Sequence, residues 1–254
     1  MKLQLEEWGL RDDPRIVCLH GVTSHGRHFA RLAEKLPGFH VQAPDLIGHG
    51  SSPYEPPWDL ETHAGAVVET VGAAPAILIG HSFGGRLALE LAARAPKLVP
   101  KLVLLDPAIH VLPPVALFAA ENARKDRAYV SFEEGIDRRY DESQLSRAPR
   151  ELVEDELRGH LVWDDGSYRY RYSQSAVVAA YGEMATEPPP FERARVPTLL
   201  VLGEQSYLPY DHLLDAHRAA LGDLLEVVVV PGGHTVLWDA LDETVSAIRG
   251  FLAS

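Results

Sequence analysis

The chain has 254 residues, of which 46% are hydrophobic and 24% are charged, and this balance suits one large globular domain or one α/β core with an insertion. The formal net charge of −12 at pH 7 argues against a nucleic-acid partner and disfavours docking onto anionic membranes. A single cysteine, Cys18, excludes an intramolecular disulfide bond. No apolar run has the length of a signal peptide or a membrane span, so we expect a cytoplasmic protein without an integral membrane segment. The composition indicates no particular oligomeric state.

The first part of the chain alternates short apolar runs with helical patterns. Residues 3–8 predict an edge strand with one solvated face. Further strands are expected at residues 15–19, 40–43, 76–79, 101–105, 198–202 and 226–230. Helices are expected at residues 29–36, 60–71, 86–95 and 242–252. Because strands and helices alternate in this way, the chain predicts an α/β fold with a mostly parallel sheet flanked by helices on both faces.

The alternation lapses between residues 107 and 195. This stretch holds helical patterns at residues 115–128, 149–161 and 175–184, and an aromatic segment at residues 163–172. It leaves the end of one expected strand and returns just before the next. We interpret residues 107–195 as a mainly helical cap over the carboxyl ends of the strands, where such sheets bind ligands. Residues 1–106 and 196–254 would then form the core.

The pentapeptide Gly80-His81-Ser82-Phe83-Gly84 lies between an expected strand and an expected helix. A serine at such a sharp turn is strained and exposes its hydroxyl, while flanking glycines relieve the crowding. The positive N-terminal end of the following helix also points at the site. The motif therefore predicts that Ser82 is a nucleophile.

A serine hydroxyl becomes a good nucleophile only when a base takes its proton. His234 is the candidate base, because it directly follows the last expected strand, which ends at the same edge of the sheet. Two backbone N–H groups must also bind the oxyanion that forms during attack. Val22 and Phe83 occupy the positions that would supply them.

Four pieces of sequence carry a resemblance to a known family. The chain resembles the α/β-hydrolase superfamily along nearly its whole length, and within it the cap-bearing esterase and lipase branch. The resemblance rests on His20-Gly21, residues 45–52, residues 80–85 and Gly233-His234. It implies the same nucleophile, base and oxyanion hole that the residues themselves indicate.

The acidic partner of the base departs from the family pattern. Many members place an aspartate where this chain has Ser206, and a serine cannot hold a fixed negative charge beside an imidazolium. Asp106 is the best replacement, because it ends the strand after the elbow helix and some lipases of this fold carry their acid in a similar context. Asp106 would otherwise only cap a turn, and Glu204 and Asp211 remain alternatives.

Other patterns are weaker. His20, His25 and His28 lack an acidic or cysteine partner at ligand spacing, so we expect no metal and no cofactor. The tyrosines of residues 168–172 share one face of a strand, which either packs onto the core or lines an acyl pocket. Glu133, Glu134, Arg138 and Arg139 are interpreted as solvated helix charges, and His49 and His81 as pocket-lining residues.

We therefore expect a serine hydrolase that cleaves small to medium carboxylic esters, with a small-molecule ester as its partner. Ser82, His234 and Asp106 would act through an acyl-enzyme intermediate. A lactone or carbon–carbon bond hydrolase with the same triad is the alternative. A small-molecule receptor with slow or no turnover is an alternative from another class. Dehalogenases and epoxide hydrolases of this fold are disfavoured, because they need a carboxylate nucleophile.

Overall fold

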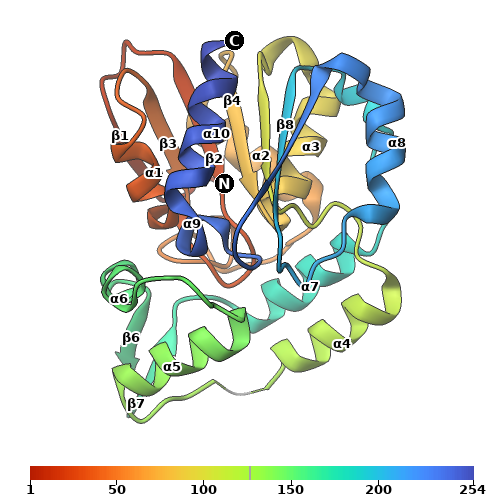
Figure 1. Cartoon of the computed structure of the whole chain (residues 1–254). Helices are drawn as coiled ribbons and strands as arrows, with labels where there is room; N and C mark the ends of the chain where they lie inside the picture. The colour runs from red at the N-terminus through yellow and green to blue at the C-terminus, as the bar shows by residue number, and fades with distance from the viewer. Residues whose placement is uncertain (126) are drawn as a thin grey trace.

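The computed structural model describes residues 1–125 and 127–254, and a seven-stranded sheet forms the centre of this described part (Figure 1). The strand order is β1-β3-β2-β4-β5-β8-β9, with β1 antiparallel to β3 and the other neighbours parallel. The strands are β1 (Leu5–Trp8), β2 (Arg15–Leu19), β3 (His40–Pro44), β4 (Ile77–His81), β5 (Leu102–Leu105), β8 (Thr198–Gly203) and β9 (Leu225–Val230). The expected α/β fold with a mostly parallel sheet is confirmed.

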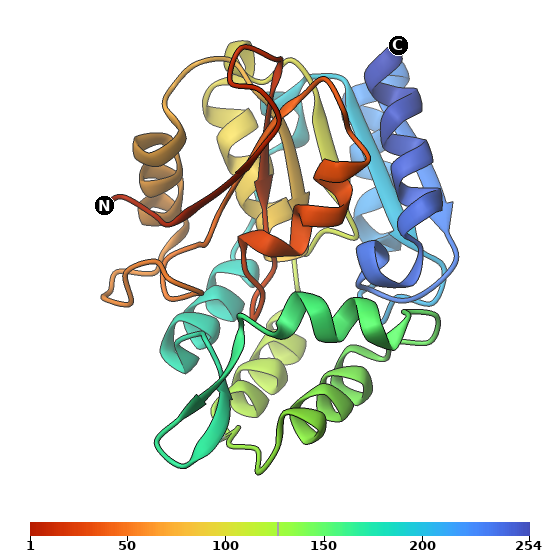
Figure 2. The same ribbon diagram turned by 90° about the vertical axis from the view of Figure 1, so that its left-hand side faces the viewer.

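Helices cover both faces of the sheet (Figure 2). One face packs against α2 (Leu60–Val71), α3 (Phe83–Arg94) and α8 (Asp211–Leu221). The other packs against α1 (Ala30–Glu34) and α10 (Leu241–Ala253), with the short α9 (Val236–Asp239) beside α10. Successive residues of β2 alternate between the two faces, so both sets must be apolar and the strand has no polar side. Among the described helices, none is both long and apolar enough to cross a membrane.

The elements between β5 and β8 form a separate layer below the sheet in Figure 1. They are α4 (Pro113–Ala123), α5 (Phe132–Ser143), α6 (Arg150–Leu157), β6 (Leu161–Asp164), β7 (Ser167–Tyr170) and α7 (Gln174–Met184). We call these elements the cap, and we propose that residues 107–195 form it as a unit. A small apolar cluster that includes Ile136, Val153 and Leu161 of this layer also contains Trp238 of α9, so it packs the cap against the core.

Several cap elements differ from those expected. Helix α4 ends at Ala123, whereas the sequence pattern extended to residue 128; Asp126 in that pattern lies outside the described residues. The helix expected at residues 149–161 ends at Leu157, and Leu161 begins the hairpin of β6 and β7. The turn of this hairpin is Asp165-Gly166, with φ of 40° and 81°. Asp-Gly favours this two-residue turn, in which both residues have positive φ.

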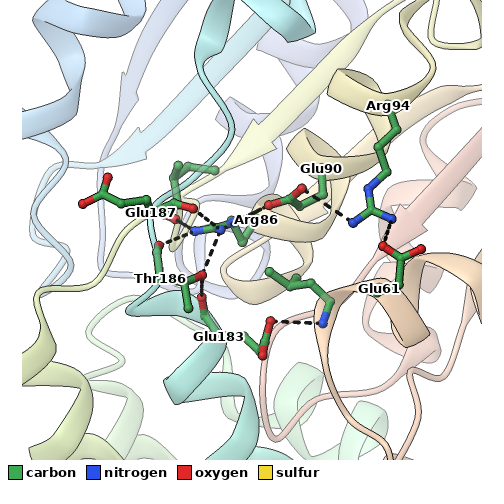
Figure 3. A network of polar contacts seen from close by, with 9 residues as sticks. Glu61, Arg86, Glu90, Arg94, Glu183, Thr186 and Glu187 are labelled. Atoms are coloured by element: carbon green, nitrogen blue, oxygen red, sulfur yellow. Dashed lines mark hydrogen bonds and ion pairs between the residues drawn. The ribbon is translucent and has the colours of Figure 1, made fainter.

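A buried arginine joins both ends of the cap to the helix that follows Ser82 (Figure 3). Arg86 of α3 donates hydrogen bonds to the carbonyl oxygens of Ile109 (2.6 Å), Thr186 (3.0 Å) and Glu187 (3.0 Å). It also pairs with Glu90 one turn further along α3, at 3.1 Å. Since Ile109 precedes α4 and the other two carbonyls follow α7, this one side chain holds both connections of the cap against the core.

Candidate active site

Ser82 occupies the turn between β4 and α3 with φ 54° and ψ −120°, a conformation that non-glycine residues rarely adopt. The surrounding glycines make this turn possible. A Cβ atom at Gly84 would lie 2.0 Å from the carbonyl oxygen of Leu19, and one at Gly80 would lie 2.3 Å from the carbonyl oxygen of Gly84. These close approaches explain why glycine stands on both sides of the serine.

His234 and Asp106 are in direct contact. The distance between His234 Nδ1 and Asp106 Oδ2 is 2.6 Å, and both side chains are buried. Asp106 follows β5, whereas His234 lies in the loop after β9, so the parallel sheet brings together two residues that are distant in sequence. An imidazole that donates through Nδ1 keeps Nε2 free to accept a proton.

The carboxylate of Asp106 accepts two further hydrogen bonds from the loop after β8. The Gly203 N–H donates to Oδ1 at 2.8 Å, and the Ser206 hydroxyl donates to Oδ2 at 2.5 Å. The two alternative acids of the sequence analysis, Glu204 and Asp211, are both exposed. Within the described residues, neither of them contacts His234.

Sequence reasoning treated Ser206 only as the residue that replaces an expected aspartate. In the structure, the Ser206 hydroxyl donates to the carboxylate of Asp106 and accepts a hydrogen bond from the Leu208 N–H at 3.1 Å. The sequence signal for this contact was the combination of a small hydroxyl residue at position 206 with an aspartate at position 106.

The loop that carries His234 is fixed from two sides. His81 Nε2 donates to the His234 carbonyl oxygen at 3.0 Å, and burial lowers the pKa of His81 well below its ordinary value, so this ring is neutral at pH 7. The carboxylate of Asp239 accepts the Gly233 N–H at 2.8 Å and, through its other oxygen, the Arg147 N–H of the cap at 3.0 Å. His234 therefore sits on a rigid support that includes the cap.

The two expected oxyanion donors flank Ser82. A Cβ atom at Gly21 would lie 2.9 Å from the Ser82 Cβ, so the loop that carries Val22 runs beside the serine. The ring of His20 fixes this loop by donating to the Gly21 carbonyl oxygen at 2.8 Å and accepting the Leu46 N–H at 2.8 Å. In the described part of the chain, the N–H groups of Val22 and Phe83 donate no hydrogen bond.

Ser82 and His234 open into one cavity of about 710 Å³ beneath the cap. Val22 and His81 also line it, whereas His49 is buried outside its walls. Its apolar wall comes from α4, α7 and the loops beside them and includes Val111, Leu112, Val115, Phe118, Val177 and Met184. Its polar wall comes largely from α5 and includes Arg138, Arg139, Glu142 and Gln144. The site thus combines an apolar side with a side that suits polar groups.

The residues expected to be solvated on α5 do not all behave alike. Glu133, Glu134 and Arg138 are exposed, as expected. The expectation for Arg139 is wrong: its guanidinium turns inward, donates to Thr23 Oγ1 at 3.0 Å and stacks over the ring of Tyr170 at 4.3 Å. Neighbouring residues on a helix point about 100° apart, so Arg139 faces Thr23 and Tyr170 while Arg138, which also lines the cavity, stays exposed to solvent.

The tyrosines of residues 168–172 serve both of the roles considered for them. Tyr170 is buried in the apolar cluster of the cap and donates its hydroxyl to the Gly135 carbonyl oxygen at 2.8 Å. Tyr172 packs beside that cluster and also lines the cavity. The aromatic segment therefore joins the interior of the cap to the wall of the site.

His20, His25 and His28 are directed to separate partners. His20 supports the oxyanion loop, while His25 stacks on His160 with ring centroids 4.3 Å apart. His28 Nδ1 lies 2.8 Å from Glu156, whose other oxygen accepts the Trp238 indole N–H at 2.5 Å. Within the described residues, no group of three His, Cys, Asp or Glu side chains is arranged to hold a metal ion.

The fold agrees with that of known proteins. The family model described as alpha/beta hydrolase fold matches residues 14–241, and the chain belongs to this family.

Named relatives and solved structures resemble the chain over nearly its whole length. The chain is 33% identical to Lipase LipV from Mycobacterium tuberculosis, with 98% of the chain and 97% of the relative covered. It is 29% identical to the sn-1-specific diacylglycerol lipase ABHD11 from Mus musculus, covering 94% of the chain and 81% of the relative. The crystal structure of E-2-(acetamidomethylene)succinate hydrolase superposes with a TM-score of 0.85 at 25% identity, covering 99% of this chain and 95% of that one.

Proposed function

We propose that this protein is a serine hydrolase that cleaves small to medium carboxylic esters, with Ser82 as nucleophile, His234 as base and Asp106 as the acid that orients the base. The observation that carries the proposal is the 2.6 Å contact between His234 and Asp106 beside the cavity into which the strained Ser82 also opens. Relatives that are named lipases support ester substrates.

The reaction proceeds in two steps. His234 takes the proton of the Ser82 hydroxyl as its oxygen attacks the ester carbonyl, and the N–H groups of Val22 and Phe83 bind the oxyanion. His234 then gives the proton to the departing alcohol. Water, deprotonated by the same histidine, attacks the acyl-enzyme and releases the carboxylic acid. Asp106 keeps the proton on His234 Nδ1 and stabilises the imidazolium in both steps.

The cavity supports substrates of modest size. Its volume of about 710 Å³ falls within the range of small-molecule sites, about 300–1,000 Å³. The apolar wall of α4 and α7 suits the hydrocarbon part of an acyl chain, and the polar wall of α5 suits the alcohol part. A cytoplasmic location and the lack of a nucleic-acid partner stay predictions from the sequence.

The test is initial-rate hydrolysis of p-nitrophenyl acetate, butyrate, octanoate and laurate. Wild type should turn over at least one of these esters, and Ser82→Ala should lower kcat by about 10³-fold or more, as in other serine triads. Ser175→Ala is the matched control, because Ser175 is exposed on α7 and does not line the cavity; its rates should equal those of wild type.

Labelling by a fluorophosphonate probe separates the enzyme from a receptor with the same fold. Rapid modification of Ser82 in wild type, absent in Ser82→Ala, supports the hydrolase. Ester turnover that survives in Ser82→Ala would refute the assignment of the nucleophile. Labelling of Ser82 without turnover of any of the four esters would overturn the ester assignment and point to lactone or carbon–carbon substrates.

A further inference from the structure

Thr23 has an unusual backbone conformation immediately after the proposed oxyanion donor Val22. Its φ is 60°, in the left-handed region. A β-branched residue there is a genuine outlier, and its backbone is strained. Strain of this kind persists only where the surrounding structure over-determines the conformation. Some other part of the molecule must therefore hold Thr23 in place.

Two side chains of the cap region provide this support. Arg139 of α5 donates to Thr23 Oγ1 at 3.0 Å and to the Thr23 carbonyl oxygen at 3.3 Å. His160, between α6 and β6, donates from Nε2 to the same carbonyl oxygen at 3.1 Å. All three hydrogen bonds run from the cap region to one residue of the core, although Thr23 lies 116 positions from Arg139 in the sequence.

Both supporting side chains are themselves held rigidly. The guanidinium of Arg139 stacks over the Tyr170 ring at 4.3 Å, and the imidazole of His160 stacks on that of His25 with an angle of 7° between the planes. Burial lowers the pKa of His160 well below its ordinary value, and the neighbouring His25 ring and Arg139 guanidinium lower it further. The ring is therefore neutral at pH 7, with its proton on the nitrogen that donates to Thr23.

We propose that Arg139 and His160 are positioning residues that hold Thr23 in its left-handed conformation and so aim the Val22 N–H at the oxyanion. This inference rests on the proposed function, because it assigns the Val22 N–H a part in the reaction. Arginine suits the task because its planar fork offers two donors in fixed directions, one for the hydroxyl and one for the carbonyl of Thr23. A lysine at position 139 would offer a single point charge.

The inference predicts a loss in turnover that is larger than the loss in substrate affinity. Removing one oxyanion donor costs about 10²–10³-fold in kcat, and a donor that is misaimed rather than removed costs part of this. Arg139→Met should therefore lower kcat by about 10- to 100-fold. Because Arg139 also lines the polar wall of the cavity, KM rises as well, but by a smaller factor than the fall in kcat. Inhibition by a trifluoromethyl ketone, whose adduct with Ser82 carries an oxyanion, should weaken in the same proportion as kcat falls.

Two further variants serve as a matched control and as a conservative replacement of Arg139. Arg150→Met is the matched control, since Arg150 is a cap arginine that pairs with Asp137 and Glu154 at the surface and does not line the cavity. Its kcat and inhibitor affinity should equal those of wild type. Arg139→Lys retains the charge over Tyr170 and should fold even if Arg139→Met does not. Its kcat and inhibitor affinity should also fall, but by less than those of Arg139→Met.

Hydrogen exchange measures the support of Thr23 without reference to activity. In wild type, the Ser24 N–H donates to the Gly21 carbonyl oxygen at 3.3 Å across the turn that contains Thr23, so this amide should exchange slowly. In Arg139→Met or Arg139→Lys it should exchange at least tenfold faster. Unchanged exchange in folded variants, or kcat and inhibitor affinity within twofold of wild type, would overturn the inference. Turnover that survives in Ser82→Ala would refute the proposed function instead, and the exchange rates would still decide whether Arg139 holds the loop.

Discussion

Replacing Asp106 with asparagine should lower kcat by about 10⁴-fold, which corresponds to about 5.4 kcal/mol of transition-state stabilisation. The magnitude follows from the hydrogen bonds that Asp106 accepts. The Gly203 N–H faces one carboxylate oxygen, and His234 Nδ1 and the Ser206 hydroxyl face the other. An asparagine must turn its NH₂ group toward one of these donors. If it faces His234, that ring must carry its proton on Nε2, where it cannot accept the proton of Ser82.

The assay is steady-state hydrolysis of p-nitrophenyl butyrate, with fluorophosphonate labelling to count competent sites. Glu204→Gln and Asp211→Asn serve as controls, because both acids are exposed and lie away from His234; each should retain kcat within twofold of wild type. An Asp106→Asn protein that is folded and keeps more than a tenth of wild-type kcat would show that another group orients His234.

The contact between Ser206 and Asp106 allows a further test of the same reasoning. The Ser206 hydroxyl already lies 2.5 Å from the oxygen that His234 contacts, so a carboxylate at position 206 would lie beside the imidazole. Adding Ser206→Asp to Asp106→Asn should therefore recover at least tenfold of the lost kcat. No recovery in a folded double variant would mean that position 206 cannot present a carboxylate to His234.

Two further predictions concern stability. Arg86→Met should lower the free energy of unfolding by about 2 kcal/mol in urea titrations. It leaves the buried carbonyl oxygen of Ile109 without its donor, at about 1–3 kcal/mol, and removes the part-buried hydrogen bonds to the carbonyl oxygens of Thr186 and Glu187. A loss below about 1 kcal/mol would contradict the role assigned to Arg86 at the cap connections. Acidification should also destabilise the fold, because burial lowers the pKa of His49 and His217 to about 4 and of His63 to about 3, from 6.5. Below pH 6.5 these histidines are protonated in the unfolded chain but stay neutral in the folded chain. The free energy of unfolding therefore falls as pH falls from 6.5 toward 4, by about 2 kcal/mol for each histidine at pH 5. Thermal unfolding between pH 7.5 and 5 should show this fall, and a His63→Leu variant should show a shallower one; equal slopes would mean that His63 takes up its proton in the folded state.

The sequence predicted the parts of the fold that depend on local pattern. The strand at residues 15–19 is apolar throughout because residues such as Val17 and Cys18 face opposite covered sides of the sheet, and a short apolar run is what that environment requires. The motif around Ser82 was recognisable because only glycine fits at Gly80 and Gly84, where a Cβ atom would clash with the backbone of the turn or of β2. Features of this kind can be predicted because they require particular residue types within a short stretch of sequence.

The features that sequence reasoning missed depend on distant contacts. Arg138 and Arg139 look alike in the sequence, and only the packing of α5 beside Thr23 and Tyr170 decides which one turns inward. The role of Ser206 could not be predicted from the sequence either, because its contact with Asp106 requires that the loops after β5 and β8 meet at the edge of the sheet. Hairpin β6–β7 was predicted only in part. The period-two spacing of the tyrosines predicted a strand where β7 lies, but strand β6 and its pairing with β7 were not predicted, although Asp165-Gly166 is a local turn signal.

The contacts of the cap bear on how substrate preference and turnover are linked in this molecule. Arg86 fixes both connections of the cap to the helix that follows Ser82, Asp239 joins the cap to the loop of His234, and Arg139 reaches Thr23 beside Val22. The elements that carry Ser82, His234 and Val22 are therefore each joined to the cap by hydrogen bonds. It follows that substitutions on α5 or in the cap connections should change kcat, whereas substitutions on the apolar wall of α4 should change chain-length preference alone.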